Sequence, residues 1–220
     1  MVDSVKTPKI GLSRLTETIP AAFSSFYLTL ISMIQGVALG LLANKIPDFL
    51  SPFEPVGFLY ILLTFTVIVI VWHEYVLSAQ EFWWELKWRD SLIPFSLGMG
   101  EFLMIEYLGK GPNYHAWFFA AALTGSAGFF AYVNYDRWLE ESDFEKPTAF
   151  QLFKNEVKRG RKLLLAFAIM NLVSGGFILH GAATREIVLL GCVCGLFLFL
   201  MVHKRLAWLG KALQIYGWRR

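Results

Sequence analysis

Charged side chains are scarce in this sequence. Asp, Glu, Lys and Arg make up 17% of its 220 residues, whereas hydrophobic residues make up 56%. Water-soluble domains usually carry more charge, and here the apolar residues extend along the whole chain instead of forming a single anchor. We therefore predict an all-α polytopic membrane protein. Because the formal net charge is only +3, we expect no nucleic acid partner.

Cysteines and catalytic motifs are also scarce. Cys192 and Cys194 lie two positions apart in an apolar run without a neighbouring His or carboxylate, which fits neither a zinc site nor a disulfide framework. The sequence lacks H-E-x-x-H, G-x-S-x-G and GK[ST] motifs, and it lacks the paired-Asp motif of intramembrane proteases. We expect no enzyme activity, no metal and no cofactor, and we expect both cysteines to be small core residues.

Long apolar stretches predict the number of membrane spans. A hydrocarbon core about 30 Å thick needs roughly 20 helical residues. We predict a single transmembrane domain over residues 1–220. A polar connection, 136–162, is expected to form a short cytoplasmic helix that leads into the fifth span, and an amphipathic basic tail, 204–220, is expected to follow the last span. This tail lies along the inner leaflet or packs on a neighbouring subunit. The six predicted spans are residues 20–42, 55–77, 91–108, 114–135, 163–179 and 186–203.

The basic residues predict how these spans are oriented. If six spans alternate in direction, all of the 20 Lys and Arg residues except Lys45, Lys110 and Arg185 fall on one side. Cytoplasmic loops carry an excess of Lys and Arg, so both termini and the 136–162 connection are expected in the cytoplasm. We expect the protein in the inner membrane of a bacterium or an archaeon.

Polar residues inside the spans are the candidates for function. Glu101 lies near the middle of the third span, after Gly98 and Gly100, where an ionised and unpaired carboxylate is costly. Two interpretations remain open: Glu101 is a neutral, hydrogen-bonded packing residue, or it lines an ion or proton path. His73 and Glu74 lie near the cytoplasmic end of the second span, where solvation alone could accommodate them.

The first span carries a motif, Phe23, Ser24 and Ser25, that resembles a known family. It is similar to the F-S-D motif that opens the first helix in the transmembrane-protein-175 family of lysosomal and bacterial potassium channels. Trp72 and His73, near the inner end of the second span, are a further similarity. The resemblance implies six helices per subunit or half-subunit, cytoplasmic termini, and a pore lined by the first helix.

The resemblance also implies the position of a hydrophobic constriction. Transferred by spacing, it falls on Leu30, Ile34 and Val37, which share one helix face at i, i+4 and i+7. The family's Asp and Arg, which fix the first helix through a buried charged network, correspond to Ser25 and Ile19. This sequence therefore lacks the residues that form that charged network.

Three functions are compatible with these features. The first is an oligomeric channel for monovalent, potassium-type cations, in which copies of the first span surround an axis and Gly36 and Gly40 allow close helix contact. The second is a non-conducting scaffold that binds a lipid or another membrane protein. The third is a proton-coupled transporter that uses Glu101. The lipid bilayer, the cations and further copies of the chain are the expected partners.

The predicted orientation can be tested by labelling cysteines introduced into two connections. Ser142→Cys should react with a membrane-impermeant maleimide only from the cytoplasmic side, and Ser51→Cys only from the other side, because an odd number of spans separates them. Reaction in intact and in inside-out vesicles measures this. The parent chain, with its two native cysteines, is the control, and labelling of both positions from one side would contradict six spans.

Overall fold

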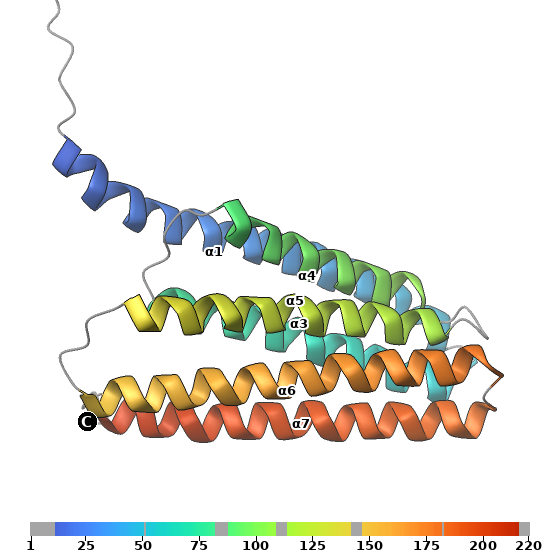
Figure 1. The fold of residues 1–220 in the computed structure, drawn as a ribbon. Coiled ribbons are helices and arrows are strands. Elements are labelled where there is room, and N and C mark those ends of the chain that lie inside the picture. The colour runs from blue at the N-terminus through green and yellow to red at the C-terminus, as the bar shows by residue number, and fades with distance from the viewer. Residues whose placement is uncertain are drawn as a thin grey trace, which may run out of the picture.

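A computed structural model of the chain describes residues 12–50, 52–81, 88–108, 114–141, 147–181 and 183–215. The positions of the topology test, Ser51 and Ser142, lie outside these ranges. Within them, every regular element is a helix (Figure 1). The helices are α1 (Leu12–Lys45), α2 (Pro47–Leu50), α3 (Pro55–Glu81), α4 (Trp88–Glu106), α5 (Tyr114–Glu141), α6 (Pro147–Leu179) and α7 (Thr184–Ile215).

Proline and glycine set several helix boundaries. Helices α2, α3 and α6 each begin at a proline, whose missing N–H needs no partner in the first turn. After α6, Gly181 adopts a φ of 100° and its N–H donates to the carbonyl of Ile178 at 3.0 Å. Glycine tolerates this left-handed conformation, which closes the end of the helix.

Five of the predicted spans each lie within a longer helix, whereas the third, 91–108, continues two residues past Glu106, where α4 ends. The 136–162 connection was expected to form a short helix that leads into the fifth span. Its residues from Pro147 onward are helical and continuous with that span in α6, and its residues up to Glu141 continue α5. Likewise, α7 continues through residues 204–215 without a break. No proline interrupts either extension, and the short helix α2 was not predicted.

Five described helices are long and apolar enough to cross a membrane. They lie in α1, α3, α5, α6 and α7, and they indicate a multi-pass integral membrane protein. The helix α4 is not among them, because its 19 residues include Arg89, Asp90, Glu101 and Glu106. The sixth span and the cytoplasmic location of the termini stay predictions.

The six long helices form two layers of three (Figure 1). Helices α1, α3 and α7 form one layer, and α4, α5 and α6 form the other. Across the layers, α1 packs on α4 and α6 packs on α7. In the middle, the backbones of α3 and α5 stay further apart, and bulky side chains bridge them: the ring centroids of Tyr60 and Trp117 are 4.7 Å apart.

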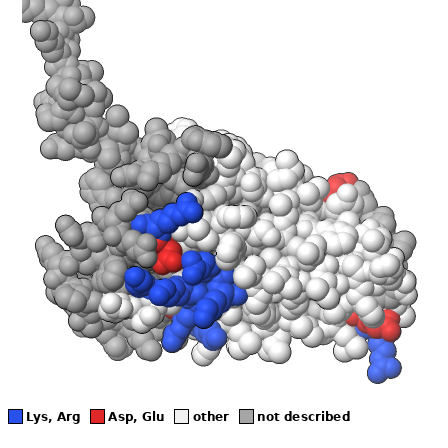
Figure 2. All heavy atoms as spheres, viewed as in Figure 1, with Lys and Arg blue, Asp and Glu red and all other residues white. Residues whose placement is uncertain are grey.

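Alternation of the helices brings basic residues together at one end of the bundle. We call this the basic end; it is formed where α5 and α7 finish and α6 starts, and Figure 2 shows its Lys and Arg side chains clustered there. Lys45 and Arg185 lie at the opposite end. The described residues of the basic end include Arg137, Lys154, Lys158, Arg159, Arg161, Lys162, Lys204 and Arg205.

Candidate functional site

Glu101 forms a buried polar pair with Gln35. The amide nitrogen of Gln35 on α1 donates to both carboxylate oxygens of Glu101 on α4, at 3.1 and 2.9 Å. Glu101 is 0% exposed and Gln35 is 3% exposed. No Lys or Arg among the described residues pairs with this carboxyl group. The pair therefore joins the two layers of the bundle through an uncharged donor.

Two glycines allow the neighbouring helices to approach Glu101 closely. A Cβ on Gly98 would lie 2.7 Å from Cγ2 of Ile34 on α1, and a Cβ on Gly100 would lie 3.2 Å from the carbonyl oxygen of Ala120 on α5. Helix α4 is thus enclosed between α1 and α5 at the depth of Glu101. This geometry favours the packing interpretation of Glu101 over a water-filled path.

The contact with Glu101 uses only the nitrogen of the Gln35 amide. The carbonyl oxygen of Gln35, Oε1, is buried and has no hydrogen-bond partner among the described residues. A half turn of the Gln35 amide would present this oxygen to Glu101, and a neutral Glu101 could then donate its proton to it. The arrangement can therefore accommodate a protonated carboxyl group without any further partner.

The predicted constriction residues lie at the edge of the packed face of α1. Leu30 and Ile34 are partly buried, and Ile34 covers Gly98, whereas Val37 is 55% exposed. The face of α1 that packs into the bundle is formed by residues spaced at three or four positions: Tyr27, Ile31, Gln35, Ala38 and Leu42. In the motif, the side chains of Phe23 and Ser24 lie outside the described part, and the carbonyl of Ser25 accepts a hydrogen bond from Thr29.

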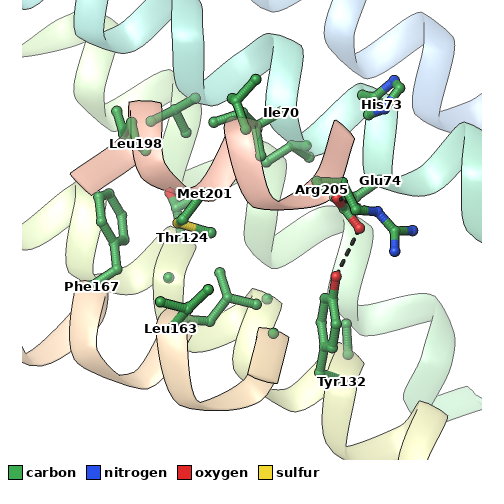
Figure 3. A pocket seen from close by; sticks show the side chains of 18 of the residues that line it. Ile70, His73, Glu74, Thr124, Tyr132, Leu163, Phe167, Leu198, Met201 and Arg205 are labelled. Atoms are coloured by element: carbon green, nitrogen blue, oxygen red, sulfur yellow. Dashed lines mark hydrogen bonds and ion pairs between the residues drawn. The ribbon is translucent and has the colours of Figure 1, made fainter. Parts of the chain in front are cut away.

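A second polar cluster contains two of the predicted residues, His73 and Glu74, at the basic end of α3. The hydroxyl of Tyr132 on α5 donates to Glu74 at 2.8 Å, and Nε of Arg205 on α7 lies 3.1 Å from the other carboxylate oxygen (Figure 3). His73 is partly buried beside them. Glu74 therefore ties α3 to α5 and α7, which is a larger role than solvation at an interface.

Sequence reasoning missed the partners Tyr132 and Arg205. Arg205 follows the apolar part of α7 and looked like one of many basic residues in the tail. The only signal was composition, since a carboxylate near a helix end is often matched by a cation on a neighbouring helix.

The cysteines and possible metal ligands take no part in either cluster. Cys194 is buried and its thiol lies 3.8 Å from Oδ1 of Asn171, while Cys192 is exposed on the surface of the bundle. Among the described residues there is no group of three or more His, Cys, Asp or Glu side chains that could hold a metal ion.

Comparisons with protein-family models, curated proteins and solved structures found no match for this chain. The resemblance to the transmembrane-protein-175 family therefore stays a prediction that is based on the sequence motif and the predicted topology.

Substitution of Glu101 tests the packing interpretation. Glu101→Gln should leave stability nearly unchanged, because two facing amides can exchange hydrogen bonds and would satisfy Oε1 of Gln35. Glu101→Leu should lower the free energy of unfolding by about 1 to 3 kcal/mol, because the Gln35 amide is left buried without a partner. Thermal unfolding of the purified protein in detergent measures both changes.

The double variant Gln35→Leu/Glu101→Leu is the matched control. Removing both polar partners should recover part of the loss, since no buried polar group then remains unsatisfied. Equal destabilisation by Glu101→Gln and Glu101→Leu would contradict the proposed exchange of hydrogen bonds between two amides. A stable, assembled Glu101→Gln protein with reduced cation flux in liposomes would instead indicate that Glu101 lines an ion or proton path.

Proposed function

We propose that this integral membrane protein assembles into oligomers around α1 and conducts monovalent cations along the axis between the α1 helices. The observation that carries the proposal is a long apolar face of α1 that contacts no other part of the described chain. The preference for cations, of the potassium type, rests on the resemblance of the first span to the transmembrane-protein-175 family.

The open face of α1 combines large apolar side chains with glycines. Phe26, Met33 and Val37 are 67%, 65% and 55% exposed. Around Gly36 and Gly40, a Cβ atom would meet nothing within 4 Å. Glycines spaced by four residues let helix backbones approach closely in a membrane. The face is therefore shaped for contact with a second helix as well as with lipid.

Gln35 fixes the direction in which this face points. It lies on the buried side of α1, and its bond to Glu101 holds the helix against α4 at one rotation. In the family that the first span resembles, a charged network holds the first helix. Here Ser25 and Ile19 replace the charges of that network, and the buried pair Gln35–Glu101 supplies a comparable attachment.

A hydrophobic constriction on α1 would include residues of its open face and residues at the edge of that face. Met33 and Val37 lie on the open face, and Leu30 and Ile34 lie at its edge. A ring of such side chains from several subunits would exclude water, and hence ions, until it is wetted. The predicted residues Leu30, Ile34 and Val37 then differ in role, because Ile34 also packs on Gly98 within the subunit.

The alternative is a non-conducting membrane protein in which the same face contacts lipid or another protein. Both interpretations leave α1 at the periphery of the single chain, and they differ in whether ions cross the oligomer. Flux in liposomes, together with the number of subunits in detergent, distinguishes them. A dependence on a pH gradient would instead indicate the proton-coupled transporter.

Truncation of the open face tests the channel directly. In liposomes that contain the purified protein, Val37→Ala and Met33→Ala should raise potassium flux severalfold, because a smaller apolar ring lowers the barrier to wetting. Ile34→Ala should mainly lower thermal stability, because it removes a contact with α4. Leu196→Ala, at an exposed position on α7, is the matched control and should change neither quantity.

Two results would contradict the proposal. A monomeric protein that carries no flux would support the non-conducting alternative. A conducting wild type with unchanged flux in both Val37→Ala and Met33→Ala would place the pore away from α1.

A further inference from the structure

A cavity of about 280 Å³ lies inside the bundle, among α3, α5, α6 and α7 (Figure 3). Its size approaches that of the smallest pockets that hold small molecules. The cavity is separate from the open face of α1, and what it binds does not depend on whether α1 conducts ions.

The cavity lies between two levels at which side chains bridge α3 and α5: the aromatic contacts of Tyr60 and the hydrogen bond from Tyr132 to Glu74. Towards the end opposite the basic end, Tyr60 of α3 meets Trp117 and Phe118 of α5, with ring centroids 4.7 and 5.8 Å apart. Towards the basic end, α5 presents Gly128 and Ala131 to the same space. These residues are too small to reach α3, so a void remains.

The body of the cavity is apolar. Val67 and Ile70 of α3 face Leu163 and Phe167 of α6, and Leu198 of α7 closes another side. Figure 3 shows Leu198, Met201 and Phe167 at one end of the cavity, together with Thr124, and Glu74, Tyr132 and Arg205 at the other. The hydroxyl of Thr124 already donates to the carbonyl of Ala120. A hydrocarbon chain would find contacts along this length without having to desolvate buried polar groups.

The polar end of the cavity lies at the basic end of the bundle. Glu74, Tyr132 and Arg205 line it and are joined to one another by the contacts at 2.8 and 3.1 Å described above. His73, the partly buried carboxylate of Glu156 on α6 and the exposed side chain of Lys204 line the same end, and Glu156 interacts electrostatically with Lys204 and Arg205. Arg205 and Lys204 are consecutive, so the last turns of α7 place two cations at the mouth of an apolar cavity.

We propose that this cavity binds one acyl chain whose anionic headgroup lies against Lys204 and Arg205 at the basic end. The apolar walls match the chain, and the position of the charge matches a carboxylate or a phosphate. The lining itself carries two carboxylates, Glu74 and Glu156, and two cations, Lys204 and Arg205, and Glu74 is already matched by Tyr132 and Arg205. Around the cavity, the described residues of the basic end include more basic side chains than acidic ones. A cationic headgroup would therefore be disfavoured.

Photo-crosslinking to a fatty acid that carries a diazirine near its methyl end tests the proposal. The full-length protein is held in nanodiscs of phosphatidylcholine, and crosslinked peptides are identified by mass spectrometry. Crosslinks should map to residues that line the cavity on α5, α6 and α7, and they should saturate at one probe per chain. Crosslinks spread over the exposed outer faces of α1 and α7 alone would overturn the proposal.

Competition identifies the headgroup and its source. Oleate and an anionic phospholipid, phosphatidylglycerol, are compared with oleyl alcohol as the uncharged chain. An anionic competitor should displace the probe at a roughly tenfold lower mole fraction than the alcohol, the ratio expected for one charge-assisted contact. The better of the two anionic competitors indicates a free acid or a lipid, and equal potency of the alcohol would overturn the role of the charge.

Filling the cavity should abolish binding. Ala131 is 7% exposed and lines the cavity, so Ala131→Phe should remove saturable crosslinking while thermal stability is kept or raised. Ala166 is exposed on α6, so Ala166→Phe adds the same group outside the cavity and should leave crosslinking unchanged. If Ala131→Phe does not fold, Val67→Phe fills the same space from α3, and unchanged saturable crosslinking in a folded filled variant overturns the site.

The headgroup contact has its own matched pair of variants. Lys204→Gln should raise the mole fraction of oleate needed for displacement by roughly tenfold, without loss of stability, because the side chain is exposed. Lys162→Gln removes an exposed charge from the same end of the bundle but does not line the cavity. Equal effects of the two variants would indicate general attraction to the basic end and would overturn a specific headgroup contact.

Discussion

The hydrogen bonds between Gln35 and Glu101 constrain how α1 packs on the rest of this bundle. Placing an unpaired charge at the centre of a membrane costs about 2.5 to 3.5 kcal/mol on insertion scales, so a polar group there must face protein. Glu101 is fully buried against α1, and the glycines beside it bring α1 and α5 close. A shift of α1 by one turn along α4 would remove Gln35 from reach. The pair therefore sets both the rotation and the height of α1.

Small residues then decide where the remaining helices touch. Gly125 and Gly128 of α5 meet Phe167, Ala168 and Leu164 of α6, where a Cβ would be crowded. Without a difference in hydrophobicity between helix and lipid, such close packing is a main source of association. Opposite α3, Gly128 and Ala131 of α5 leave space beside the contact between Tyr132 and Glu74. Close contact with α6 and a void beside α3 therefore follow from the same small residues.

Hydropathy predicted the helices well because length and apolarity are local properties. It could not predict their pairing, since a helix that is apolar on all sides does not show which face is buried, and 66 positions separate Gln35 from Glu101. The helical continuation of α5 and α6 beyond their spans could not be read from hydropathy, because Glu, Lys and Arg continue a helix as readily as apolar residues do. Tyr132 and Arg205 were missed for a similar reason: their meeting with Glu74 depends on how α5 and α7 flank α3.

The helix α3 connects the two regions to which functions are assigned. It packs on α1 on one side and on α7 on the other, and α1 has no comparable contact with α7 among the described residues. Polar contacts hold α3 at both ends of the cavity: Tyr60 donates to the carbonyl of Ile187 at 2.9 Å, and Glu74 meets Arg205. An acyl chain bound in the cavity could change the distance between α3 and α7 only if one of these two contacts breaks. Any effect of the cavity on α1 must therefore pass through α3 or α4, and it must act against the bond between Gln35 and Glu101.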